Sequence, residues 1–131
     1  MSKISHINLS VSDFEKSLEF YNTLMFALDF KKGLDESGDW GAVRGYKGDG
    51  IELEIIHEND IDYTTFNRFP GLNHICFEVE SRDEVDEMYG LVKTLGVEIT
   101  REPKEYPEYT DKYYDFFFRD PDGMPLEIAF I

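Results

Sequence analysis

The sequence predicts an α+β fold made of two tandem βαβββ modules, which together form a curved mixed sheet around a cleft. A chain of 131 residues has the length of one domain. Two observations set the architecture within that length. A stretch of sequence from the first half recurs in the second half, and the same order of apolar patterns follows each copy.

The repeat is clearest at the start of each half. Residues 5–11 (SHINLSV) resemble residues 73–79 (NHICFEV), so that His6 corresponds to His74. Apolar and polar residues alternate in both stretches, as in a strand that has one face on a core. Each module therefore begins with a half-buried strand.

A helix is expected after each of these strands. Both strands run into an S-x-x-E sequence, at Ser12 and at Ser81, which is the pattern of a capping box at a helix start. Apolar residues then recur at helical spacing, and Gly96 ends the second helix. They are Phe14, Leu18, Tyr21 and Met25 in the first helix and Val85, Met88, Tyr89, Val92 and Leu95 in the second.

Three extended segments follow each helix. They are expected at residues 26–31, 41–46 and 51–57 in the first half and at 97–100, 113–119 and 126–131 in the second. Turn-forming sequences, KGDG and DPDG, separate the last two strands of each half.

These elements divide a single domain, residues 1–131, into two modules and a linker. Module one spans about residues 1–57, the linker spans 58–71, and module two spans about 72–131. A long polar loop is expected at residues 101–112, and loops of this length often form lids or substrate walls.

Composition excludes several classes of partner. The chain has 13 Lys and Arg against 28 Asp and Glu, a net charge of −15 that would repel nucleic acid and anionic membrane surfaces. No apolar stretch is long enough to span a membrane, and the first residues lack the apolar core of a signal peptide. A single cysteine, Cys76, argues against a disulfide framework. We expect a cytoplasmic protein.

Two histidines and two glutamates occupy repeat-related positions. His6 and His74 lie on the first strand of each module, and Glu54 and Glu127 each follow a turn glycine by four residues. Alternation places these side chains opposite the aliphatic face, so they line the cleft. Glu52 shares the face of Glu54.

Two neutral imidazoles and two carboxylates suit a divalent metal ion. An ion that prefers six ligands would keep about two positions for water or substrate oxygens. The residues do not distinguish zinc, nickel, manganese and iron. Arg44, Arg101 and Arg119 are candidate clamps for a substrate carboxylate, and Tyr113 or Tyr114 could donate a hydrogen bond to a substrate.

Together, the double module, the His6 and His74 strands, and the sequence FFRDPDGMPLE at residues 117–127 resemble the vicinal oxygen chelate superfamily. That group includes glyoxalase I, fosfomycin resistance transferases, extradiol dioxygenases and bleomycin-binding proteins. The resemblance implies His6, His74 and Glu127 as metal ligands, with Glu54 as the fourth ligand or Glu52 in its place.

The resemblance also implies the function. We expect a metal-dependent lyase or isomerase of the glyoxalase type, acting on a small substrate that chelates the metal through adjacent oxygens. Glu127 is the first candidate for the catalytic base and Glu54 the second. The alternatives are an extradiol-type dioxygenase, which would need only two histidines and one carboxylate, and a non-enzymatic antibiotic-binding protein. A homodimer is expected because related chains commonly place their clefts at a subunit contact.

Overall fold

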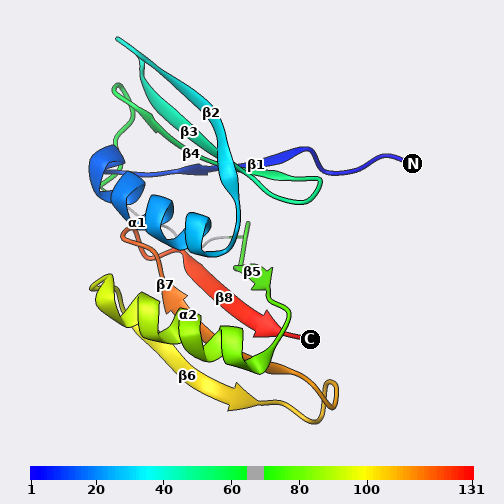
Figure 1. Ribbon diagram of the computed structural model, residues 1–131. Helices are drawn as coiled ribbons and strands as arrows, with labels where there is room; N and C mark the ends of the chain where they lie inside the picture. The colour runs from blue at the N-terminus through cyan, green and yellow to red at the C-terminus, as the bar shows by residue number, and fades with distance from the viewer. Residues whose placement is uncertain (65–69) are drawn as a thin grey trace. The chain divides into compact units, whose positions relative to one another are not determined.

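The computed structural model describes residues 1–64 and 70–131 and confirms the α+β fold with two βαβββ modules. The chain divides into two compact units, Met1–Phe66 and Asn67–Ile131, with the boundary inside the predicted linker 58–71. Residues 65–69 of that linker lie outside the described residues. Each unit consists of a four-stranded sheet and one helix (Figure 1).

The two modules have the same topology. Module one contains β1 (His6–Ser10), α1 (Phe14–Ala27), β2 (Lys31–Gly38), β3 (Gly41–Lys47) and β4 (Glu52–Glu58), in the sheet order β1-β4-β3-β2. Module two contains β5 (Ile75–Glu78), α2 (Arg82–Thr94), β6 (Ile99–Glu105), β7 (Tyr114–Arg119) and β8 (Pro125–Phe130), in the order β5-β8-β7-β6. The first and last strands of each module are parallel and the other pairs are antiparallel, so both sheets are mixed.

Each helix packs against the apolar face of its own sheet. Helix α1 contacts β3 and β4, and helix α2 contacts β6, β7 and β8. On the α2 side, Phe116 and Phe118 are fully buried and their rings stack with centroids 5.3 Å apart. Burying each such side chain contributes about 1.5–3 kcal/mol. Alternation then leaves the opposite face of each sheet to polar side chains.

The helix starts match the predictions in one module only. At α2 the Ser81 hydroxyl accepts a hydrogen bond from the Glu84 N–H (3.2 Å), as the capping box predicts. At α1 the predicted cap Ser12 is wrong, because Asp13 takes that position and accepts from the Lys16 N–H (3.1 Å). An aspartate cap also interacts favourably with the positive end of the helix dipole. Neither of these two helices, in the ranges 1–64 and 70–131, is long and apolar enough to cross a membrane.

The second strand of module one begins later in the structure than the sequence predicts. Residues 26 and 27 of the predicted segment 26–31 belong to α1, which continues to Ala27 because Leu24 and Met25 are fully buried, and residues 28–30 form the turn that follows. The chain then reverses at Asp29, which has a positive φ of 64°. Strand β2 follows at Lys31–Gly38, an edge strand whose side chains are mostly exposed. A strand with little apolar surface has no alternation from which to predict it.

The predicted long loop 101–112 is shorter in the structure. Its first part is strand β6, which pairs with β7 at the edge of the second sheet. The register shifts between Arg101 and Lys104, on either side of Pro103. Proline has no N–H to donate and is tolerated in an edge strand or a bulge, so Pro103 lies within strand β6.

Gly41, the first residue of β3, is expected to reject any side chain. Its φ is 141°, and a Cβ atom there would lie 1.9 Å from the carbonyl oxygen of His57. We expect Gly41→Ala to lower the free energy of unfolding by about 2 kcal/mol, measured by urea denaturation. Gly90 of α2 is the control: nothing lies within 4 Å of its Cβ position, and Gly90→Ala should raise the free energy by about 0.5–1 kcal/mol. Similar changes at both positions would contradict this account.

Candidate functional site

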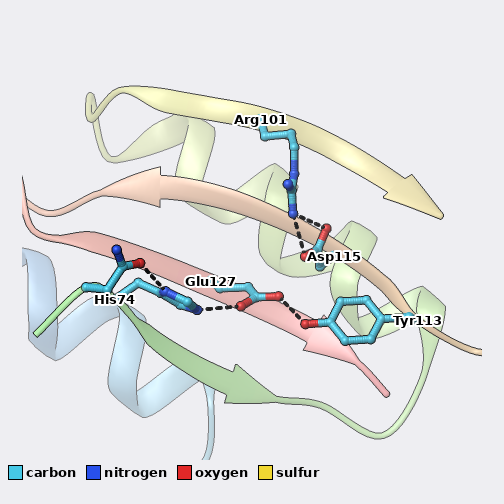
Figure 2. Close-up of polar contacts among 6 residues, drawn as sticks. His74, Arg101, Tyr113, Asp115 and Glu127 are labelled. Carbon is cyan, nitrogen blue, oxygen red and sulfur yellow. Dashed lines mark hydrogen bonds and ion pairs between the residues drawn. The ribbon is translucent and has the colours of Figure 1, made fainter. Parts of the chain in front are cut away.

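In module two, the face opposite α2 carries a connected set of polar side chains from four adjacent strands. Strand register places Glu127 of β8 between Cys76 of β5 and Phe117 of β7. Tyr113 and Asp115 share the parity of Phe117, and Arg101 of β6 pairs with Phe117 on the far side. Figure 2 shows His74, Glu127 and Tyr113 as one chain of contacts, with Arg101 and Asp115 beside it.

The turn before β8 sets the position of Glu127. Asp120 Oδ1 accepts hydrogen bonds from the N–H groups of Asp122 (2.9 Å) and Met124 (2.8 Å). Gly123 has a φ of 93°, a conformation that glycine adopts without strain. The turn thereby fixes the start of β8, and the Glu127 side chain is 3% exposed on the polar face.

His74 and Glu127 are in direct contact. The Nε2 atom of His74 lies 3.2 Å from Glu127 Oε2. On the other side of the ring, Nδ1 lies 2.8 Å from Asn73 Oδ1. Because that amide oxygen can only accept, Nδ1 carries the proton and donates it. In the neutral ring, the lone pair of Nε2 then faces the Glu127 carboxylate, and in the protonated ring Nε2 donates to it.

This arrangement fits a metal ion. A nitrogen lone pair and a carboxylate oxygen repel each other at 3.2 Å unless a proton or a cation lies between them. Two donor atoms that each bind one metal at about 2.1 Å are about 3.0–3.4 Å apart. A hydrogen bond from Nδ1 to a protein oxygen is also the usual way in which a metal-binding histidine is oriented.

Neutral and charged neighbours act on the pKa of Glu127. Burial alone would raise this pKa, but hydrogen bonds from Asp115, Tyr113 and Cys76, with the nearby His74, hold it below its usual value. Tyr113 Oη donates to Glu127 Oε1 at 2.7 Å. The carboxylate is therefore kept in the ionised form that metal binding requires.

The neighbours of Glu127 stay protonated more readily than usual. Burial, and then the hydrogen bond to Glu127, raise the pKa of Asp115 to about 7, although the Arg101 guanidinium acts in the opposite direction. Burial and the Glu127 carboxylate raise the pKa of the Cys76 thiol to about 12. A thiol with so high a pKa is a poor nucleophile, although the Cys76 residue is exposed.

Module one carries the equivalent positions with different partners. Its register pairs Asn8 with Glu54, as Cys76 pairs with Glu127 in module two. Asn8 Nδ2 donates to Glu54 Oε2 at 2.9 Å, and Glu54 is 8% exposed. Ser5 Oγ lies 2.8 Å from His6 Nδ1. The residue before the histidine thus contacts the same ring nitrogen in both modules.

Glu52, the rival of Glu54, is directed elsewhere on the same sheet. Its Oε1 accepts a hydrogen bond from the Leu34 N–H of β2 at 2.8 Å. The carboxylate occupies space beside two glycines, since a Cβ atom at Gly33 or Gly45 would lie 2.0 or 1.9 Å from it. Strands β2 and β3 therefore accommodate the Glu52 carboxylate, because each has a glycine beside it.

Two of the predicted ligands, His6 and Glu54, belong to the first unit, and the other two, His74 and Glu127, belong to the second. The structure brings His74 and Glu127 into contact, and it places Glu54 beside Asn8 and pairs His6 with Glu52 in the strand register. Within residues 1–64 and 70–131, no three His, Cys, Asp or Glu side chains gather as a metal site. The use of all four residues as one site stays a prediction.

The three arginines suggested as substrate clamps already have partners. Arg44 is paired with Asp35 (3.2 Å) and Arg101 with Asp115 (2.7 Å). Arg119 is 3.3 Å from Glu98 Oε2 and donates to the Gly123 carbonyl. The negatively charged partners reduce the attraction of these arginines for a substrate carboxylate.

Sequence reasoning missed Asn8 and Asp115. Alternation places both on the polar face. Asp115 and Phe117 flank Phe116, whose side chain is on the opposite face, and Asn8 lies two residues after His6. The alternation was visible in the sequence. The contacts with Glu54 and Glu127 depended on strand pairing.

Comparison with known proteins identifies the family. Residues 3–128 match the glyoxalase/bleomycin resistance protein/dioxygenase superfamily. The metallothiol transferase FosB of Lysinibacillus sphaericus is 33% identical over 132 residues, covering 97% of this chain and 81% of FosB. The fosfomycin resistance protein FosX of Listeria monocytogenes is 30% identical over 128 residues, covering 98% of this chain and 89% of FosX.

Solved structures agree with this comparison. A glyoxylase/bleomycin resistance protein/dioxygenase domain from Frankia superposes with a TM-score of 0.79 at 26% identity, covering 99% and 98% of the two chains. The FosX structure with Mn(II) and sulfate superposes with a TM-score of 0.71 at 22% identity, covering 100% and 93%. The chain belongs to the glyoxalase/bleomycin resistance protein/dioxygenase superfamily, and the resemblance seen in the sequence is confirmed.

Arg101 is expected to stabilise the fold by neutralising a buried carboxylate. Asp115 has a side chain only 2% exposed, so Arg101→Gln should lower the free energy of unfolding by about 2 kcal/mol. The loss should be greater at pH 8 than at pH 5, because without the guanidinium the pKa of Asp115 rises further and the acid can be neutral at the lower pH. Arg82→Gln is the control, since Arg82 pairs with the exposed Glu105 and should cost less than about 1 kcal/mol. Equal losses for the two variants in urea denaturation would show that burial of Asp115 is unimportant.

Proposed function

We propose that the protein is a metal-dependent enzyme of the glyoxalase type, a lyase or isomerase whose substrate chelates the metal through adjacent oxygens. The observation that carries the proposal is the contact of His74 Nε2 with Glu127 Oε2, in which two metal-binding atoms face each other at 3.2 Å. Two relatives support metal dependence: FosB is a metallothiol transferase, and FosX has been solved with Mn(II).

In this proposal His6, Glu54, His74 and Glu127 bind one divalent metal ion. The bound metal would act as a Lewis acid that polarises substrate oxygens and stabilises negative charge on them. Glu127 suits the role of a permanent ligand because its neighbours hold its pKa low, and a carboxylate with a low pKa is a weak base.

We therefore assign proton transfer first to Glu54. It accepts from the neutral amide of Asn8, which orients Oε2 without adding a positive charge. The carboxylate would take a proton from a carbon next to a substrate oxygen and return it to the neighbouring carbon. Glu127, the first candidate by sequence, becomes the second.

The electrostatics favour a substrate that is neutral or cationic. The chain carries a net charge of −15, and Arg44, Arg101 and Arg119 are each engaged with a carboxylate of the protein. A binding protein for a cationic ligand is the second candidate function, because the same charge would attract such a ligand. We propose a homodimer in either case.

Metal binding tests the site directly. We expect protein purified without chelators to hold one divalent metal per chain, measured by elemental analysis, and the His6→Ala, His74→Ala double variant to lose it while remaining folded. Retention should fall as the pH drops through about 6.5, because imidazole must be deprotonated to bind a metal. His57→Ala is the control, since its Nδ1 contacts the Val11 carbonyl (2.8 Å). Stoichiometric metal in the folded double variant would refute the site, and the binding-protein function would take its place.

The two glutamates of β4 can be separated by the same measurement. We expect Glu54→Gln to reduce metal content more than Glu52→Gln. Glu54 holds the register position equivalent to Glu127, whereas the Glu52 carboxylate is bound to the Leu34 N–H. Both variants keep the shape of the side chain, so each serves as the control for the other. The reverse order of metal contents would assign the fourth ligand to Glu52.

A further inference from the structure

The two oxygens of the Glu127 carboxylate have different partners. Oε1 accepts a hydrogen bond from Tyr113 Oη at 2.7 Å, and Oε2 faces His74 Nε2 at 3.2 Å (Figure 2). The hydrogen bond from Tyr113 therefore orients the carboxylate so that Oε2 is the oxygen directed at His74.

The Tyr113 side chain is itself held in place. Its ring meets Tyr106 edge-on with centroids 6.1 Å apart, and Tyr109 with centroids 5.5 Å apart. The Tyr106 N–H donates to the Tyr113 carbonyl at 2.9 Å, which closes the loop that carries Tyr109. A hydroxyl fixed in this way loses little conformational entropy when it orients the carboxylate.

We infer that Tyr113 is a positioning residue that keeps Glu127 a metal ligand through Oε2 alone. The inference rests on the proposed function, in which Glu127 binds the metal. With Oε1 engaged by the phenol, only Oε2 remains directed at His74. Without the phenol the carboxylate is free to turn and to bind with both oxygens.

This constraint matters for the proposed chemistry. A metal with six positions and four one-atom ligands keeps two positions, the number that a substrate needs to chelate through adjacent oxygens. A Glu127 bound through both oxygens would take one of them. Tyr113 would thus preserve the chelating mode of substrate binding without touching the substrate.

The neighbouring tyrosine offers a matched control. Tyr114 also donates to a carboxylate at 2.7 Å, but its partner is Asp86 of α2, on the other face of the sheet. Tyr113→Phe and Tyr114→Phe therefore remove the same atom, from the same residue type and at the same distance, from adjacent positions. Circular dichroism and urea denaturation would verify that both variants fold.

The experiment measures Mn(II) affinity by electron paramagnetic resonance and the absorption spectrum of the Co(II)-loaded protein. We expect Tyr113→Phe to weaken Mn(II) binding by about 10–100-fold, the usual effect of removing a group that orients a ligand, and to change the Co(II) spectrum. Binding of acetohydroxamate, which chelates through two oxygens, should weaken more than binding of azide, which uses one atom. Tyr114→Phe should leave all three measurements within about twofold of the original protein.

A third variant, Glu127→Gln, separates the inference from the function on which it rests. If Glu127→Gln loses Mn(II) but Tyr113→Phe matches the original protein in affinity, spectrum and hydroxamate binding, the inference is overturned and the proposed function stands. If Glu127→Gln binds Mn(II) as tightly as the original protein, Glu127 is not a ligand, and both the inference and the four-residue metal site are overturned.

Discussion

The polar face of each module depends on the parallel pairing of its first and last strands. This pairing lays β1 beside β4 and β5 beside β8, although more than forty residues separate the paired positions in each case. It places Asn8 opposite Glu54 and Cys76 opposite Glu127. Because the helices occupy the apolar faces, the histidines and glutamates have no other side on which to lie.

The repeat made the larger part of this arrangement predictable. His74 and Glu127 were found because each has a counterpart at a matching position in module one, and alternation assigned both to one face. Strand β2 was misplaced because a polar edge strand lacks an apolar pattern, and the cap Asp13 was missed because two capping residues stand side by side in the sequence. Glu52 and Glu54 share a face, so only the positions of Gly33 and Gly45 distinguish their directions.

The environment of Glu127 differs from that of an ordinary surface carboxylate. Neutral donors from β5 and β7 and the region before β7 stabilise its charge, while Arg101 is directed to Asp115. The positive charge of Arg101 is thereby paired with Asp115, a neighbour of Glu127. Arg101 therefore does not compete with a bound cation for the Glu127 carboxylate, and the attraction between the carboxylate and a cation is strong where little water screens it.

The two glycines beside Glu52 bear on how such a chain can change during evolution. Each leaves the space that the Glu52 carboxylate now fills, so a side chain at either position would exclude the carboxylate from that space. Glu52 would then turn toward other parts of the polar face, where its register partner is His6. One mutation on a neighbouring strand could thus exchange one candidate ligand for another while every histidine and glutamate is conserved. A superfamily with many activities can diversify in this way through residues that contact neither metal nor substrate.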